Sequence, residues 1–275
     1  MEKQVRFGTA DLEPDPWRPS AWLVSVDGVL QSYVDLDDPT YLRMPFTVWM
    51  AQVIERHWPA GAAISAVHVG GGGLTLPRYL AADRPGSEQT VFELDGPLVD
   101  LVREHLGLDA VPGVRVEVRD GRAGVEGMPD DSADLVVVDV FRGGDVATEL
   151  ATVEFVRQIG RVLRPGGLYA TNLWDGGDLG FALRAVAAIG EVFPHVLVFG
   201  ETGVLIKLRP GNLVVVASSR ELPVAELAAW AKDYPSSVNC LTPPQFADTC
   251  GTAPPLTEAD PQVRLVPSVR PWRRD

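Results

Sequence analysis

Apolar runs of strand length alternate along the chain with segments whose apolar residues recur every three or four positions. The runs are typical of buried strands, and the second spacing is typical of helices that bury one face. Such alternation predicts a parallel sheet covered by helices on both faces. The predicted strands are 64–69, 90–94, 114–118, 134–140, 168–173, 195–199 and 212–218, and the predicted helices between them are 74–80, 97–106, 148–163 and 180–192.

The last two strands differ from the others in their connection. A loop around Arg209-Pro210-Gly211-Asn212 joins 195–199 to 212–218. Strands joined without a helix pair most simply as antiparallel neighbours. We therefore predict an α/β fold with a doubly wound, mostly parallel, seven-stranded sheet whose last strand is antiparallel.

Two β-rich runs precede this sheet and form a candidate hairpin. They are 21–26 and 29–35, and between them lies Asp27-Gly28, a dipeptide typical of tight hairpin turns. Residues 1–20 are polar and contain three prolines, so we expect a loosely held arm there. The apolar positions of 45–57 fit an amphipathic helix.

The chain therefore divides into three predicted parts. Beyond Ser219 only 223–233 has a helical pattern, and the proline-rich remainder is predicted to be irregular. The parts are 1–58, with the arm, hairpin and connecting helix; 59–220, the α/β domain; and 221–275, the C-terminal helix and tail.

Composition narrows the function classes. The chain has 275 residues, 46% of them hydrophobic, and a net charge of -13. This length and apolar content suit one large domain with a small appendage. The negative charge argues against nucleic acid and anionic membranes as partners and favours a cationic substrate. Because there is no apolar export segment at the N-terminus and no run of roughly 18 apolar residues, we expect a cytoplasmic protein.

Residues that commonly bind metals are few and scattered. The two cysteines, Cys240 and Cys250, follow no metal-ligand spacing, and the four histidines are far apart in the sequence. We expect no metal site. His68 falls inside an apolar strand, which favours a hydrogen-bonded core residue over a catalyst.

The strand 64–69 ends in four glycines, Gly70, Gly71, Gly72 and Gly73. Glycines permit positive φ angles and close approach of a ligand, and the following helix start offers free N–H groups, so we expect a small polar ligand there. A tight turn needed only for packing is the alternative. The dinucleotide fingerprint is broken, because Thr75 occupies the place of its third glycine.

Acidic residues follow the next strands at the same relative place. Glu93 lies about 20 residues after Gly73, the offset at which an acidic side chain binds ribose hydroxyls. No Lys or Arg lies between Ile64 and Pro77, so a neutral or cationic nucleoside suits the loop better than a pyrophosphate. The pattern points to an adenosyl group that carries a sulfonium.

Four successive strands end in candidate site residues, and the carboxyl ends of parallel strands meet at one edge of a sheet. Asp120 can accept a hydrogen bond from an exocyclic amine such as adenine N6, and Asp139 can steer an attacking amine or take its proton. The full set at these ends is Gly70–Gly73, Glu93 with Asp95, Asp120 with Gly121, and Asp139.

Two further residues are candidates for contacts with a substrate. Arg142 follows Asp139 in a glycine-containing loop, where it is either an anion contact or a solvated arginine. Trp174 ends the strand 168–173 and is either part of a substrate wall or part of a surface turn.

Together these motifs resemble the spermidine/spermine synthase family, the polyamine aminopropyltransferases, within the Rossmann-like methyltransferase superfamily. The likeness runs from about Trp22 to Ser218 and implies a methyltransferase-like sheet in a Rossmann-like catalytic domain. The matching segments are the hairpin motif around Gln31, the glycine loop with Glu93-Leu94-Asp95, the pair Asp120-Gly121, and the strand that ends at Asp139.

The resemblance implies a reaction and roles for individual residues. An aminopropyl group would pass from decarboxylated S-adenosylmethionine to a polyamine, with methylthioadenosine released. Asp139 matches the catalytic aspartate of the family, and Gln31 would face the thioether or aminopropyl region of the donor. Family members also pair through the N-terminal β element, so a homodimer is a further expectation.

The segment after Asp139 departs from the family pattern. The family usually continues with Ser-Ser/Thr-Asp-Pro, whereas this chain has Val140-Phe141-Arg142-Gly143. Three hypotheses follow. The first is an aminopropyltransferase with an altered amine acceptor, and the second is a methyltransferase that uses intact S-adenosylmethionine. The third is a non-catalytic relative that binds a nucleoside.

Overall fold

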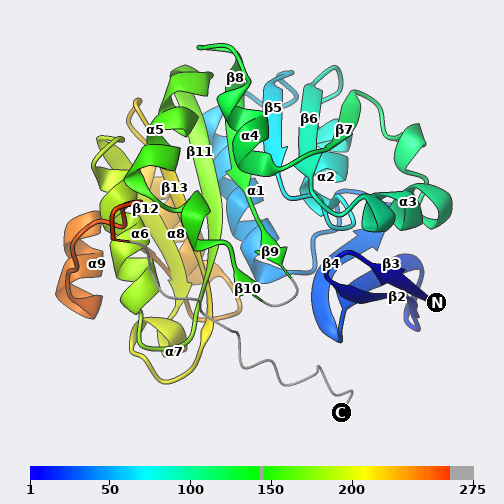
Figure 1. The fold of residues 1–275 in the computed structure, drawn as a ribbon. Coiled ribbons are helices and arrows are strands. Elements are labelled where there is room, and N and C mark those ends of the chain that lie inside the picture. Colours follow the sequence, from blue (N-terminus) through cyan, green and yellow to red (C-terminus); the bar gives the residue numbers. More distant parts are fainter. Residues whose placement is uncertain (143–144, 261–275) are drawn as a thin grey trace.

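The computed structural model describes residues 1–142 and 145–260, and its main feature is an eight-stranded sheet with the order β14-β12-β13-β11-β8-β5-β6-β7 (Figure 1). The strands from β11 to β7 are parallel, and β13 is antiparallel to both β11 and β12. This confirms the predicted fold class. The bounds are β5 Ser65–Val69, β6 Glu88–Glu93, β7 Val114–Val118, β8 Ala133–Val138, β11 Leu163–Asp175, β12 His195–Glu201, β13 Gly211–Ser218 and β14 Val238–Leu241.

The eighth strand, β14, lies in a segment that was predicted to be irregular. It pairs antiparallel with β12, and the helix α9 follows it. The prediction was wrong because a strand of four residues has too few alternating positions to be distinguished from a loop.

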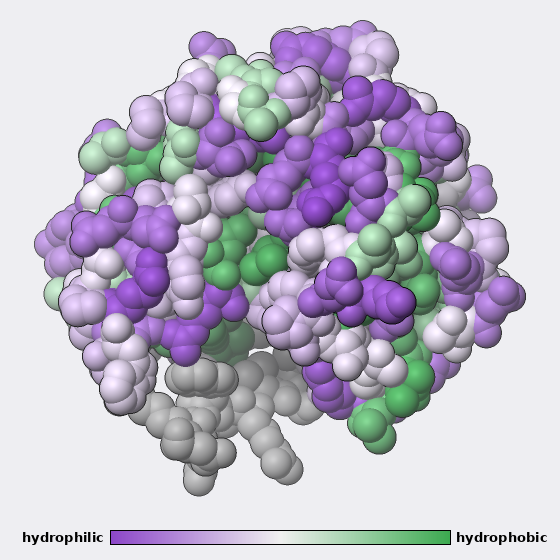
Figure 2. Space-filling view, turned by 180° about the vertical axis from the view of Figure 1, so that it is seen from behind, coloured by the Kyte–Doolittle hydropathy of each residue, from purple (hydrophilic) through white to green (hydrophobic). Residues whose placement is uncertain are grey.

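Helices cover both faces of the sheet. Figure 1 looks onto α4, α5 and α6, with α1 behind the strands. Seen from behind in Figure 2, the other face is mostly hydrophilic, and apolar residues lie in a hollow near its centre. The helices are α1 Pro45–His57, α2 Thr75–Asp83, α3 Gly96–His105, α4 Gly121–Glu126, α5 Val153–Val162, α6 Gly180–Gly190, α7 Thr202–Leu205, α8 Val224–Asp233 and α9 Pro243–Cys250.

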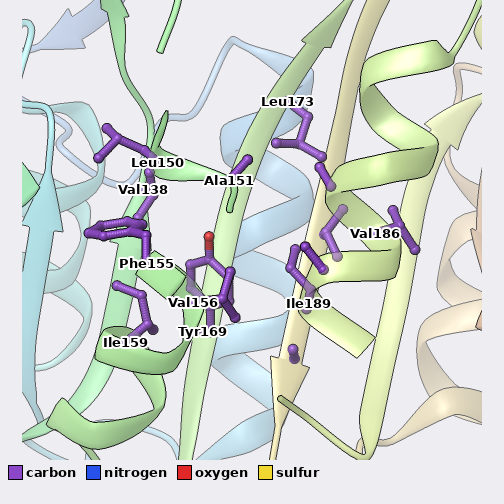
Figure 3. Close-up of a cluster of buried hydrophobic side chains, with 14 of the residues drawn as sticks. Val138, Leu150, Ala151, Phe155, Val156, Ile159, Tyr169, Leu173, Val186 and Ile189 are labelled. Atoms are coloured by element: carbon purple, nitrogen blue, oxygen red, sulfur yellow. The ribbon is translucent and has the colours of Figure 1, made fainter. Parts of the chain in front are cut away.

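The core on the α5 and α6 side fixes these two helices against the middle of the sheet. In Figure 3, Phe155 and Ile159 of α5 lie beside Val138 of β8, and Ile189 of α6 lies on the same face of the sheet. Full burial of such side chains contributes about 1.5–3 kcal/mol each. This packing holds the carboxyl ends of β8 and β11 in a fixed relation.

The N-terminal region is a four-stranded antiparallel sheet with the order β1-β2-β3-β4. The predicted hairpin is confirmed as β3 and β4, with positive φ angles at Asp27 and Gly28. The loosely held arm was a wrong prediction, because β1 and β2 occupy it. The bounds are β1 Glu2–Val5, β2 Gly8–Asp15, β3 Arg18–Val26 and β4 Val29–Asp35.

The prolines that favoured an arm lie where a strand tolerates them. Pro14 pairs with Trp22 of β3 beside a register shift, and it lies past the end of the pairing between β1 and β2. It therefore needs no backbone donor on its free side. Polar composition and prolines misled the prediction, since neither reveals pairing with a later strand.

Three contacts attach this small sheet to the α/β domain. Asp95 accepts hydrogen bonds from the backbone N–H groups of Arg6 and Phe7, and Ser32 Oγ accepts one from Gly73 N at 2.8 Å. The Thr75 hydroxyl donates to the carbonyl oxygen of Tyr33. The N-terminal sheet is thereby held over the glycine loop.

Two other predictions concern membranes and the chain end. Among the described residues, no helix has the length and apolar character that a membrane crossing requires. Within the predicted tail, 251–260 contain an isolated bridge between Thr257 and Asp260, and 261–275 lie outside the described residues.

We expect Gly124→Ala to lower the free energy of unfolding by about 1–3 kcal/mol. A Cβ at Gly124 of α4 would lie 2.5 Å from the Phe92 ring on β6, so the helix must move away from the sheet. Gly190→Ala is the matched control, because a Cβ there meets nothing within 4 Å. Urea unfolding followed by circular dichroism measures both, and equal stabilities would contradict the packing of α4.

Candidate active site

A pocket of about 330 Å³ opens at the carboxyl ends of the central strands, beneath the N-terminal sheet. It brings together nearly all the residues predicted from the sequence. Gly73 is an exception among the described residues, because it turns toward Ser32 and does not line the pocket. The predicted residues that line it are Gln31, Gly70, Gly71, Gly72, Glu93, Asp95, Asp120, Gly121, Asp139 and Trp174.

The glycine loop passes very close to the end of β8. Gly70 has φ +90°, and a Cβ there would lie 2.1 Å from the backbone oxygen of Asp139. Asp139 N in turn donates to Val69 O at 2.9 Å. Only glycine fits this position, so the loop and the candidate catalytic residue depend on one backbone contact.

The N–H groups of the glycine loop are all engaged within the protein. Gly70 N donates to Phe92 O, and Gly73 N donates to Ser32. Gly71 N and Gly72 N donate to the Glu93 carboxylate at 2.7 and 3.2 Å. The loop itself therefore keeps its backbone donors within the protein, because the carboxylate that follows the next strand already satisfies its middle.

Glu93 thus supports the loop from β6 and also faces the pocket. Its second oxygen accepts from Asp95 N at 2.9 Å. Each carboxylate oxygen has two acceptor positions, so these three bonds leave one position, on Oε1, for a hydroxyl donor from a ligand.

Asp95 and Asp120 both cap helices. Asp95 is 2% exposed and accepts from Leu98 N at the start of α3, besides its bonds to Arg6 and Phe7. Its carboxylate is therefore engaged mainly by the backbone. Asp120 caps α4 through Ala123 N, and it remains partly exposed at the pocket wall.

Asp139 lines the pocket from the end of β8 and is half-buried. This burial raises the pKa of Asp139 from its ordinary value of 3.8 to about 6, and a hydrogen bond from Asn172 acts in the opposite direction. A carboxylate with such a pKa is a base suited to neutral pH.

Asn172 is a site residue that the sequence interpretation missed. Its Nδ2 donates to Asp139 Oδ1 at 3.0 Å, and it lines the pocket from β11. A usable signal was present, because Asn172 is a polar residue that follows the apolar run of β11 near its carboxyl end, as Asp139 does on β8. Asn212 of β13, and Met44 and Phe46 at the start of α1, also line the pocket and were not predicted.

Of the other residues singled out in the sequence, some line the pocket and others do not. Gln31 and Trp174 line the pocket from β4 and β11. Arg142 belongs to the short strand β9 Phe141–Arg142, which pairs with β10 Asp145–Val146, but its side chain lies outside the described part of the structure, as do residues 143–144. His68 is 2% exposed and hydrogen-bonds Gln89, which confirms a core position, and burial lowers its pKa to about 4.

Known proteins resemble this chain in sequence and in structure. No family model matches the chain. The curated spermidine synthase 1 of Pisum sativum is 31% identical over 108 residues, which are 38% of this chain and 32% of the pea protein. A polyamine aminopropyltransferase of Chromobacterium violaceum is 24% identical over 148 residues, 54% of this chain and 55% of that protein. The chain thus matches between about a third and about half of the length of these relatives.

A solved structure extends the likeness to nearly the whole chain. A probable spermidine synthase from Corynebacterium glutamicum is 28% identical, with a TM-score of 0.86 and coverage of 94% of this chain and 96% of that chain. The chain is therefore similar to spermidine synthases in both sequence and fold. The family's methyltransferase-like fold is also seen in spermidine synthase from Thermotoga maritima, with a TM-score of 0.61 at 16% identity, and in human methyltransferase-like protein 13, with 0.55 at 20%.

Burial of the Asp139 carboxylate has a testable energetic consequence. Asp139 binds its proton more tightly in the folded than in the unfolded chain, so its ionisation lowers stability as the pH rises from 3.8 to about 6. We expect Asp139→Asn to raise the free energy of unfolding by up to about 3 kcal/mol at pH 7. Chemical unfolding measured from pH 3.5 to pH 8 tests this. The gain should vanish below the ordinary pKa, and a gain independent of pH would contradict the explanation.

Proposed function

We propose that this protein is an aminopropyltransferase, which moves an aminopropyl group from decarboxylated S-adenosylmethionine to an amine. The observation that carries the proposal is the buried carboxylate of Asp139, which lies beside the glycine loop in a chain similar to spermidine synthases. The same position on the sheet is where open α/β folds bind ligands.

The charge of the pocket supports a cationic donor. The described lining includes four carboxylates and no Lys or Arg side chain. A sulfonium and an ammonium are attracted to such a pocket, whereas the carboxylate of intact S-adenosylmethionine is repelled. The carboxylates are Glu93, Asp95, Asp120 and Asp139.

The residues have complementary tasks in donor binding. Glu93, at the end of β6, would accept hydrogen bonds from the ribose hydroxyls, and Asp120, at the end of β7, would accept one from the adenine amine. Gln31 would lie against the aminopropyl region from the N-terminal sheet. The donor supplies an electrophilic carbon next to its sulfonium.

Asp139 would act on the acceptor. An amine nitrogen attacks the carbon next to the sulfur, the new C–N bond forms as the C–S bond breaks, and methylthioadenosine leaves as a neutral thioether. The nitrogen must lose a proton, and Asp139, with a pKa of about 6, can hold the ammonium and receive that proton. Since Val140, Phe141 and Arg142 replace the usual acceptor segment of the family, we propose that the acceptor is altered.

Donor preference is the first test. We expect decarboxylated S-adenosylmethionine to bind at least about tenfold more tightly than the intact form, equivalent to about 1.4 kcal/mol, because the pocket repels a carboxylate. Isothermal titration calorimetry with both donors and with methylthioadenosine measures this. Preference for the intact form would instead support methyl transfer.

Two substitutions separate binding from chemistry. Asp139→Asn should leave the affinity for methylthioadenosine within twofold and reduce aminopropyl transfer by about 100-fold or more. Glu93→Gln should weaken methylthioadenosine binding by about tenfold, because it removes an acceptor from both the ribose and the glycine loop. Full turnover in Asp139→Asn would exclude Asp139 as the catalytic base.

A further inference from the structure

The amide of Asn172 has one engaged end and one unengaged end. The residue is 6% exposed, and its Nδ2 donates to Asp139 Oδ1 at 3.0 Å. Its Oδ1 is buried and has no hydrogen-bond partner in the described part of the chain. A buried acceptor without a donor is unfavourable, so this oxygen requires an explanation.

The orientation of the amide follows from its neighbour. If the amide were reversed, its oxygen would face the Asp139 carboxylate, and two acceptors would oppose each other. The contact with Asp139 therefore directs Nδ2 toward the carboxylate and leaves Oδ1 on the other side of the amide, without a donor. A bound molecule with an N–H group can satisfy it.

A second amide on the same face has the same property. In the register of β11 and β13, Asn172 lies opposite Val214, and Trp174 lies opposite Asn212. Asn172 and Asn212 are therefore diagonal neighbours on one face of the sheet. Both line the pocket, and Asn212 Oδ1 is also buried without a described partner. The pocket wall beside Asp139 thus contains two amide oxygens, and a ligand that donates N–H groups would satisfy them.

We propose that Asn172 is a positioning residue for Asp139. Its Nδ2 fixes the carboxylate and favours the ionised form, while its Oδ1 accepts an N–H from the nitrogen that Asp139 binds. The second part, the identity of that nitrogen as the amine acceptor, rests on the proposed function. The first part holds for any ligand of the pocket.

The effect of Asn172 on the pKa of Asp139 can be measured, because few other groups influence that pKa. Burial raises the pKa of Asp139 to about 6, and the Asn172 bond is what opposes the rise. The other titratable groups that face the pocket in the described chain are His68, Glu93, Asp95 and Asp120. None of these contributes to the shift of the Asp139 pKa. Removal of the Asn172 amide should therefore leave burial as the one remaining influence on that pKa.

The test is a titration of Asp139 by NMR of protein with ¹³C-labelled aspartate carboxyl groups, with the signal assigned through Asp139→Asn. We expect Asn172→Ala to raise the pKa of Asp139 by about one unit, the size of a charge-assisted hydrogen bond. Asn172→Asp, which keeps the shape of the side chain, should raise it further, because like charges oppose ionisation. Asn212→Ala is the matched control and should leave that pKa unmoved, since no hydrogen bond joins it to Asp139.

Kinetics with decarboxylated S-adenosylmethionine and butylamine or putrescine provide the second measurement. The acid limb of kcat/KM for the amine should move upward by the same amount in Asn172→Ala, while methylthioadenosine affinity stays within twofold. If the NMR titration is unchanged in both Asn172 variants, the proposal is wrong. If the titration shifts but no amine is alkylated, the proposed function fails and the positioning of Asp139 stands.

Discussion

The backbone contact between Gly70 and Asp139 is the constraint on which the rest of the site depends. A Cβ at position 70 would lie 2.1 Å from the Asp139 carbonyl oxygen, so the chain can turn away from β5 here only with glycine. The neighbouring bond from Asp139 N to Val69 O continues the ladder between β5 and β8 to the very edge of the sheet. The pocket floor and the buried carboxylate are consequently built from the same few backbone atoms.

The glycine loop serves the fold as much as the ligand. Its N–H groups are satisfied by Glu93, by Ser32 and by Phe92 O, so the loop joins β6 and the N-terminal sheet to the end of β5. Since these donors are engaged, the pocket presents carboxylates and amide oxygens to a ligand. An acceptor-rich, negatively charged pocket in a chain of net charge -13 is suited to cations, which agrees with a sulfonium donor and an ammonium acceptor.

The pocket makes ionisation of Asp139 unfavourable. Burial favours the protonated carboxyl, whereas binding of an ammonium and removal of its proton require the ionised form. The amide of Asn172 offsets part of that cost through one hydrogen bond, and no basic side chain in the described lining does so. In the proposed reaction, the ammonium of the acceptor would supply the remaining electrostatic stabilisation of the ionised carboxylate.

The sequence by itself determined the α/β architecture and the edge of the sheet where the site lies, because apolar periodicity and strand-terminal glycines and carboxylates are local signals. It located Gly70, Glu93 and Asp139 correctly at the pocket, although their roles in binding and catalysis stay predictions. Only the tertiary structure decided how β1, β2 and β14 pair, why Asp95 is engaged in capping, and that Asn172 touches Asp139. Each of these depends on a partner far away in the chain, and such a partner leaves no periodic trace near the residue itself.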